Sequence, residues 1–192
     1  MMSKMSQSLL EAKEFILTKK ILSVRTHYDF LDLQGNKLGE AYGNLVQIPS
    51  KFSAFDSKGT QVIQIAGKAF SNDRTYTFYN SSGEQIGTIK AIFQKEGSQF
   101  FVYKGERQLM HIHRQTSSKS ALESLVSLAN PDELLGPLLN YVVEVDGQTV
   151  AMFHRKWPAL RHQIVLSITG EVDHRLVIGS VIVVEHVDVE GK

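Results

Sequence analysis

The sequence contains no cysteine among its 192 residues. This absence excludes disulfide bonds, thiolate metal sites, cysteine nucleophiles and S-palmitoylation, and it fits a reducing compartment. An excess of positive or negative charge is also absent, because 21 Lys and Arg face 20 Asp and Glu, for a formal net charge of +1. The chain therefore has no global field that would attract nucleic acid, and we expect no nucleic-acid partner.

Apolar segments of membrane-spanning length are missing as well. The most extended apolar run is "LVIGSVIVV", Leu176 to Val184, much shorter than the roughly 20 residues that a transmembrane helix needs. The first fifteen residues contain no apolar core of signal-peptide length. We expect a cytoplasmic protein that is at most peripheral to a membrane.

A polar turn recurs along the first half of the chain. "DLQG" ends at Gly35, "DSKG" at Gly59 and "NSSG" at Gly83, a spacing of 24 residues. Asp or Asn at the first position accepts a hydrogen bond from the backbone two residues on, and the fourth-position glycine tolerates positive φ and closes the turn with a bulge. Aromatic and aliphatic residues alternate on both sides, as in half-buried antiparallel strands. The pattern predicts a series of β-hairpins.

Two further turns follow, with an insertion between them. Gly105 marks one turn, and Asp146-Gly147 is a signal for a type I′ hairpin. Residues 116–140 interrupt the rhythm with apolar residues at helical spacing, and we expect short helices within 119–139. This insert either covers one end of the fold or binds a protein partner. Because a lone hairpin cannot bury its apolar face, the repeated hairpins must stack or close into a ring.

The apolar run near the C-terminus has two interpretations. Nine consecutive residues without a polar face indicate a segment buried on all sides. Its β-branched residues favour a central strand, whereas Asp173 as an N-cap allows a helix.

The hairpin rhythm, the segment from Val143 to Trp157 ("VEVDGQTVAMFHRKW") and the terminal apolar run together resemble the LURP-one-related proteins. That family belongs to the tubby C-terminal-like superfamily, which also contains the phospholipid scramblases. The resemblance covers residues 15–187 apart from the insert. It implies a mainly β fold, a closed antiparallel barrel of about twelve strands with a buried apolar C-terminal helix through its centre. We therefore expect a helix at 176–184, one domain at 15–190, and a flexible or short helical tail at 1–14.

The best signal for an enzyme is the pair His111 and His113, which lie on one strand face and resemble half of a cupin metal motif. A cupin also needs a glutamate shortly afterwards, where this chain has Ser117 and Ser118. We interpret the histidines as polar residues on an outward face, and we assign no metal, cofactor or catalytic residue. A metal-dependent barrel enzyme that uses both histidines remains an alternative.

Basic residues recur at matching phases of the hairpins, and equivalent positions in a closed barrel lie at similar heights. A rim that contacts lipid phosphates could therefore form from Lys19, Lys20, Arg25, Lys68, Arg74, Arg155, Lys156 and Arg161. The resemblance implies a non-catalytic barrel that binds membrane phospholipid, phosphoinositide or another ligand. A scramblase-like membrane-associated protein is the other alternative, although the chain lacks the dense acidic loop of that group.

Overall fold

The structure is a computed structural model that describes residues 8–20, 25–44, 50–68, 74–94, 97–115, 140–156 and 163–190. Twelve strands precede a helix. The strands are β1 (Glu14–Lys19), β2 (Thr26–Leu31), β3 (Lys37–Asn44), β4 (Lys51–Asp56), β5 (Gln61–Gly67), β6 (Thr75–Tyr79), β7 (Gln85–Gln94), β8 (Gly97–Lys104), β9 (Arg107–Arg114), β10 (Asn140–Val145), β11 (Gln148–Lys156) and β12 (Gln163–Ile168). The helix, α2, spans His174–Glu190.

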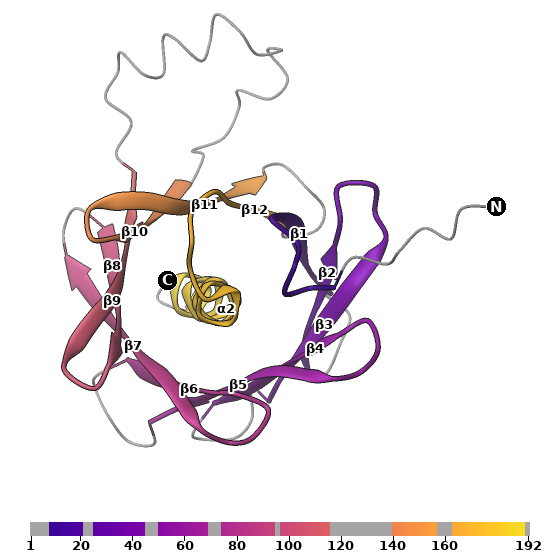
Figure 1. The fold of residues 1–192 in the computed structure, drawn as a ribbon, viewed down its shortest axis with the longest axis horizontal. Coiled ribbons are helices and arrows are strands. Elements are labelled where there is room, and N and C mark those ends of the chain that lie inside the picture. Colours follow the sequence, from indigo (N-terminus) through magenta and orange to yellow (C-terminus); the bar gives the residue numbers. More distant parts are fainter. Residues whose placement is uncertain are drawn as a thin grey trace, which may run out of the picture.

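The strands form one closed antiparallel barrel in which each strand pairs with its neighbours in the sequence. The ring closes where β1 pairs with β12, with Phe15 opposite Leu166. Figure 1 looks down the barrel and shows α2 in its lumen. The prediction of a twelve-stranded barrel with a central C-terminal helix is confirmed. Closure leaves no open sheet edge, which is how a protein made of apolar hairpins avoids pairing with other chains.

The recurring polar turns have the predicted geometry. Gly35, Gly59 and Gly83 have φ of 86°, 80° and 79°. In the first turn, the backbone N–H groups of Gln34 and Asn36 donate to Asp32 Oδ1 at 2.9 and 2.7 Å. A register shift precedes each of these turns, as a bulge requires. Asp146 and Gly147 both have positive φ, of 50° and 77°, as a type I′ turn demands.

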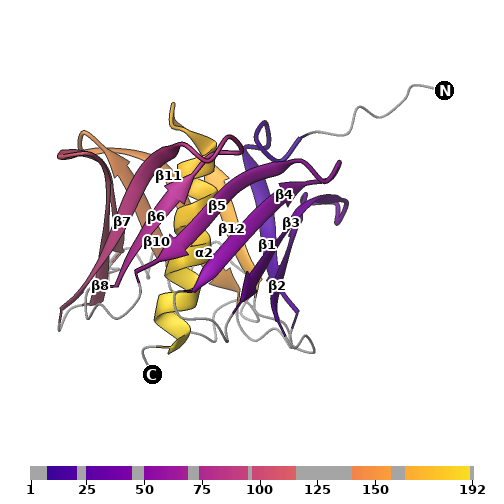
Figure 2. The ribbon, with the colours of Figure 1, turned by 90° about the horizontal axis from the view of Figure 1, so that it is seen from below.

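These four turns and the turn at Gly105, which has φ of 61°, lie at the same end of the barrel, which we call the turn end. Odd-numbered strands run away from it and even-numbered strands run toward it, because all neighbours are antiparallel. The helix α2 enters the lumen at the turn end, after β12, and its C-terminus lies at the opposite end (Figure 2).

The helix α2 is enclosed on all sides. Every residue from Leu176 to Val187 is buried. A Cβ on Gly179 would lie 2.8 Å from Ile63 Cδ1 and 3.1 Å from Phe78 Cε1, so glycine permits the close approach to β5 and β6. Local β propensity is overridden because an aliphatic surface all round the helix fills the lumen with side chains.

Other expectations fall partly outside the described residues. Of the predicted tail at 1–14, residues 8–14 are described. Leu9 and Ala12 are fully buried and belong to the core, and Glu14 is the first residue of β1. The predicted helical insert at 119–139 lies outside the described residues. Within the described part of the chain, no helix combines the length and the hydropathy needed to cross a membrane.

Candidate functional site

Most of the predicted basic rim is described, and those residues lie at one end of the barrel. Lys19 ends β1 and Lys20 follows it. Arg25 precedes β2, and Lys68 and Arg74 flank the connection between β5 and β6. Arg155 lies near the end of β11, followed by Lys156, whose side chain is outside the described residues, as is the whole of Arg161. We call this end, opposite the turns, the basic end.

Two further basic residues lie at the basic end, although they were not predicted as part of the rim. They are Lys51, the exposed first residue of β4, and Arg114, the last residue of β9. Antiparallel pairing explains the clustering, because every odd strand ends and every even strand begins here.

Two of the rim arginines hold the C-terminal turns of α2. Arg155 forms a salt bridge with Glu185, a carboxylate whose side chain is 1% exposed. Arg74 Nη1 donates to the carbonyl oxygen of Val187 at 3.2 Å, where the last turn of a helix lacks backbone donors and carries partial negative charge. These two side chains therefore have a structural role whatever they meet in solution.

Lys20 lies beside a charged cluster on the outer wall. Its Nζ is 2.8 Å from Asp29 Oδ2, and Lys37 Nζ is 3.2 Å from Asp29 Oδ1. Burial alone would raise the pKa of Asp29, but hydrogen bonds and charge from the two lysines hold it below its ordinary value. His27 and Glu40 complete the cluster, with His27 Nε2 3.4 Å from Glu40 Oε2.

Two large apolar side chains are exposed next to the rim. Ile92 is 44% exposed and Phe93 51% exposed, near the end of β7. The Arg74 guanidinium carbon lies 4.7 Å from the centre of the Phe93 ring, within the range of a cation–π contact. The basic end thus combines cations with an exposed aromatic and an exposed aliphatic side chain.

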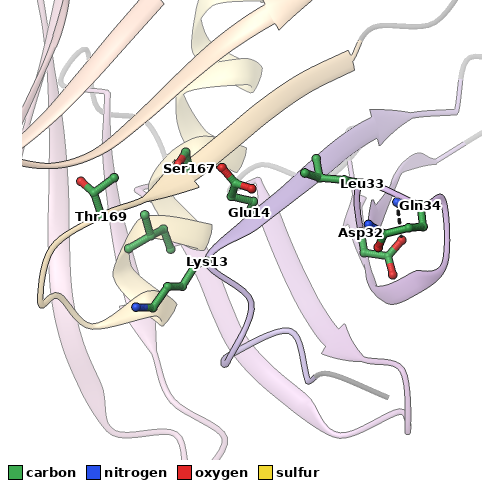
Figure 3. A pocket seen from close by; sticks show the side chains of 8 residues that line it. Lys13, Glu14, Asp32, Leu33, Gln34, Ser167 and Thr169 are labelled. Atoms are coloured by element: carbon green, nitrogen blue, oxygen red, sulfur yellow. Dashed lines mark hydrogen bonds between the residues drawn. The ribbon is translucent and has the colours of Figure 1, made fainter. Parts of the chain in front are cut away.

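A pocket of about 540 Å³ lies at the turn end. In Figure 3, Lys13 and Glu14 at the start of β1 lie between the β2–β3 turn, with Leu33, and the end of β12, with Ser167 and Thr169. Lys13 and Glu14 are exposed and opposite in charge. No residue of the predicted rim lines the pocket, and its mixed lining, which includes Leu33 and Ile168, selects no ligand class.

The two histidines of the cupin-like motif lie on the outer wall, as predicted, and a third group joins them. His113 Nε2 is 3.5 Å from Glu144 Oε1, and His111 Nδ1 is 3.9 Å from Glu144 Oε2. Glu144 comes from β10, directly opposite His111 in the strand register. Burial and the neighbouring His113 lower the pKa of His111 below its ordinary value, against the attraction of Glu144.

With this geometry established, the comparisons with known proteins identify the family. The family model for LURP-one-related proteins matches residues 44–185. The chain belongs to the LURP-one-related family. A crystal structure of an Arabidopsis thaliana protein is similar to it, with a TM-score of 0.56 and 16% identity over 91% of each chain. At that identity the likeness shows the fold alone. No curated protein matches the sequence.

The LURP-one-related match begins at the last residue of β3 and ends at Glu185 in α2. It therefore includes both Glu144 and Glu185, two acidic residues whose partners the sequence did not reveal. In a cupin, the glutamate follows the two histidines closely in the sequence. In this chain the acidic neighbour of the histidines is Glu144 of β10, which lies beyond the insert. A search for acids at hairpin-equivalent positions, instead of nearby ones, would have found Glu144.

Proposed function

We propose that this LURP-one-related barrel is a non-catalytic module that binds anionic membrane phospholipid, phosphoinositides foremost, through its basic end. One observation carries the proposal. Cationic side chains from several connections gather at the end that also exposes Ile92 and Phe93. Cations meet lipid phosphates by charge-assisted hydrogen bonds, and exposed apolar side chains add burial in the interface.

The opposite end differs in charge. The described carboxylates there include Glu14, Asp32, Asp56, Glu84, Glu106, Asp146, Glu171 and Asp173, and the described cations include Lys13, Lys58, Lys104, Arg107 and Arg175. A net charge of +1 is thus divided between a basic end and an end at which the described carboxylates outnumber the described cations. An anionic surface attracts the basic end and repels the turn end, which orients the barrel.

The enclosure of α2 favours surface binding over the scramblase-like alternative. Membrane insertion of the run from Leu176 to Val184 requires an apolar segment that can leave the protein, and this run fills the lumen with each residue buried. Removing it would expose the inner face of every strand to water, at a cost that grows with the apolar area. We therefore assign the lipid contact to the rim.

The charge contribution is tested by vesicle co-sedimentation. The vesicles contain phosphatidylcholine alone, with phosphatidylserine, or with phosphatidylinositol bisphosphate. Each cation near an anionic surface contributes roughly 1 kcal/mol, so Arg25→Gln with Lys68→Gln weakens binding to anionic vesicles about 30-fold. The matched control, Arg107→Gln with Lys58→Gln at the turn end, removes the same charge and leaves binding unchanged. Equal loss in both variants contradicts a specific role of the basic end.

The apolar contribution is tested separately. Phe93→Ser weakens binding without changing its salt dependence, whereas the charge variant makes binding less sensitive to salt. Leu33→Ser is the control, since Leu33 is 52% exposed at the turn end. The proposal is contradicted if the wild-type protein binds none of the three kinds of vesicle, or if it transfers lipid between leaflets.

A further inference from the structure

We propose that His111, His113 and Glu144 bind a divalent transition-metal ion such as Zn²⁺ on the outer wall of the barrel. The ligand atoms of the three side chains all lie within 4.8 Å of one another. Two imidazoles and one carboxylate suit zinc and its neighbours in the first transition row. The site would be an open one, with three protein ligands and at least one position left for water or an exogenous group.

The distances are close to those that zinc needs. Tetrahedral zinc with ligand bonds of about 2.0–2.1 Å separates its ligand atoms by about 3.3 Å. Glu144 Oε1 and Oε2 lie 3.5 Å from His113 Nε2 and 3.9 Å from His111 Nδ1. Each of the three side chains is only about 30% exposed, at 28%, 31% and 30% for His111, His113 and Glu144. Because the ligand atoms already lie near the separation that zinc requires, small side-chain rotations complete the site without movement of the strands.

The second ring nitrogen of each histidine faces an acceptor. His111 Nε2 lies 3.1 Å from Gln99 Oε1, and His113 Nδ1 lies 3.4 Å from the carbonyl oxygen of Arg114. An acceptor requires the proton on that nitrogen, so in the neutral rings the lone pairs of His111 Nδ1 and His113 Nε2 face Glu144. Metal-binding histidines are oriented in this way by outer partners. Two lone pairs facing a carboxylate repel it, and a cation between them removes that conflict.

The orientation of the His111 ring is also fixed by a stacking contact. The ring stacks on Phe101, with ring centres 4.6 Å apart and an interplanar angle of 5°. Phe101 and His111 are register partners on β8 and β9, and Glu144 is the partner of His111 on β10. Three consecutive strands therefore position the ligands, a rigid support of the kind that metal sites need.

The second histidine and carboxylate cluster of the barrel provides a contrast. His27, Asp29 and Glu40 also have ligand atoms within 4.8 Å of one another. There Lys20 and Lys37 lie against Asp29, and Lys37 forms a salt bridge with Glu40. The lysines occupy the carboxylates and supply the positive charge, so a metal ion would have to displace them. Among the described residues, by contrast, the basic side chains given within 4.0 Å of the Glu144 carboxylate are the two histidines.

The test is calorimetric titration of the full chain with ZnCl₂ after treatment with a chelator. We expect one Zn²⁺ per chain. Outer partners of metal ligands change affinity by about 10–100-fold, so Gln99→Leu weakens binding within that range, and Glu144→Gln or His113→Asn weakens it by at least about 100-fold. Glu40→Gln and His27→Asn, which make the same changes in the other cluster, leave binding unchanged. Mg²⁺ gives no heat, because it prefers oxygen ligands.

The visible spectrum of the Co²⁺-loaded protein supplies a second measurement. Intense d–d bands of four-coordinate Co²⁺ appear in the wild type and disappear in Glu144→Gln and His113→Asn, while circular dichroism of the metal-free variants stays that of the wild type. Absence of Zn²⁺ binding in the wild type overturns the proposal. So does binding that persists at full affinity in both ligand variants, since the ion then lies elsewhere.

Discussion

At the scale of single residues, Glu185 is a carboxylate buried in the core. It lies in a helix enclosed by the aliphatic and aromatic side chains of the core, and its side chain is 1% exposed. Burying an unpaired carboxylate costs several kcal/mol. Arg155, near the end of β11, forms a salt bridge with this carboxylate, and its own side chain is 18% exposed. The pair ties the last turns of α2 to the barrel wall.

Arg155→Gln is therefore expected to destabilise the protein strongly. The substitution leaves Glu185 buried without its cation, and the loss of one partner of a buried pair lowers the free energy of unfolding by about 3–5 kcal/mol. Urea denaturation followed by circular dichroism measures it. Arg107→Gln, an exposed arginine at the turn end, changes stability by less than about 0.5 kcal/mol.

A double substitution separates the pair from other effects of the mutation. Arg155→Gln with Glu185→Gln removes both charges, and most of the lost stability returns because no buried charge is left uncompensated. Additive losses in the double variant are incompatible with this account.

At the scale of secondary structure, the start of α2 is fixed by Asp173. The backbone N–H of Arg175 donates to Asp173 Oδ1 at 3.0 Å, and the Arg175 side chain donates to the same carboxylate. Burial alone would raise the pKa of Asp173, but the hydrogen bonds from Arg175 lower it below its ordinary value of 3.8. The ionised form of Asp173 is thus the one that caps the helix.

The cap makes stability depend on pH. Because the pKa of Asp173 is lower in the folded than in the unfolded chain, its contribution is present above 3.8 and disappears as the pH falls through the folded value. Asp173→Ala is expected to lower the free energy of unfolding by about 1 kcal/mol near neutral pH. The difference from the wild type shrinks at acidic pH.

Asp173→Asn is the matched control, because an amide oxygen still caps the helix and does not titrate. Its difference from the wild type is small near neutral pH. Urea unfolding curves of the three proteins at several pH values measure these differences. A penalty of Asp173→Ala that stays constant down to the lowest pH contradicts the assignment.

The same scale shows which elements the sequence could predict. The turns at Gly35, Gly59 and Gly83 were predictable because their geometry depends on four adjacent residues. The helix α2 was predicted only through the family resemblance, because its β-branched residues favour a strand and the cause of the helix is the ring of strands around it.

The candidate sites were less predictable than the fold. Glu144 and His111 become neighbours only through the pairing of β9 with β10, across an insertion that interrupts the hairpin rhythm. The rim was predictable in position, since antiparallel strands bring alternate connections to one end. The inward contacts of Arg74 and Arg155 depend on where α2 ends, which no local pattern states.

At the scale of the whole molecule, the closure of the barrel and the filling of its lumen by α2 depend on each other. The pairing of β1 with β12 joins segments from opposite ends of the chain, and α2 follows β12 directly into the lumen. The inner faces of the strands and the helix form one hydrophobic cluster. Neither part can lose the other without exposing that cluster to water, so the barrel and α2 should unfold together.

Amide hydrogen exchange with and without vesicles tests how this unit meets a membrane. Backbone amides of α2 should exchange at the rate of global unfolding, since opening α2 means opening the barrel. Vesicles with phosphatidylinositol bisphosphate should leave α2 equally protected and slow exchange near Ile92, Phe93 and Lys68, because the basic end contacts the headgroups while the lumen stays closed. Vesicles of phosphatidylcholine alone are the control. If anionic vesicles instead change exchange in α2 and leave the basic end as it was, the helix has left the lumen, and insertion replaces surface binding as the mode of membrane contact.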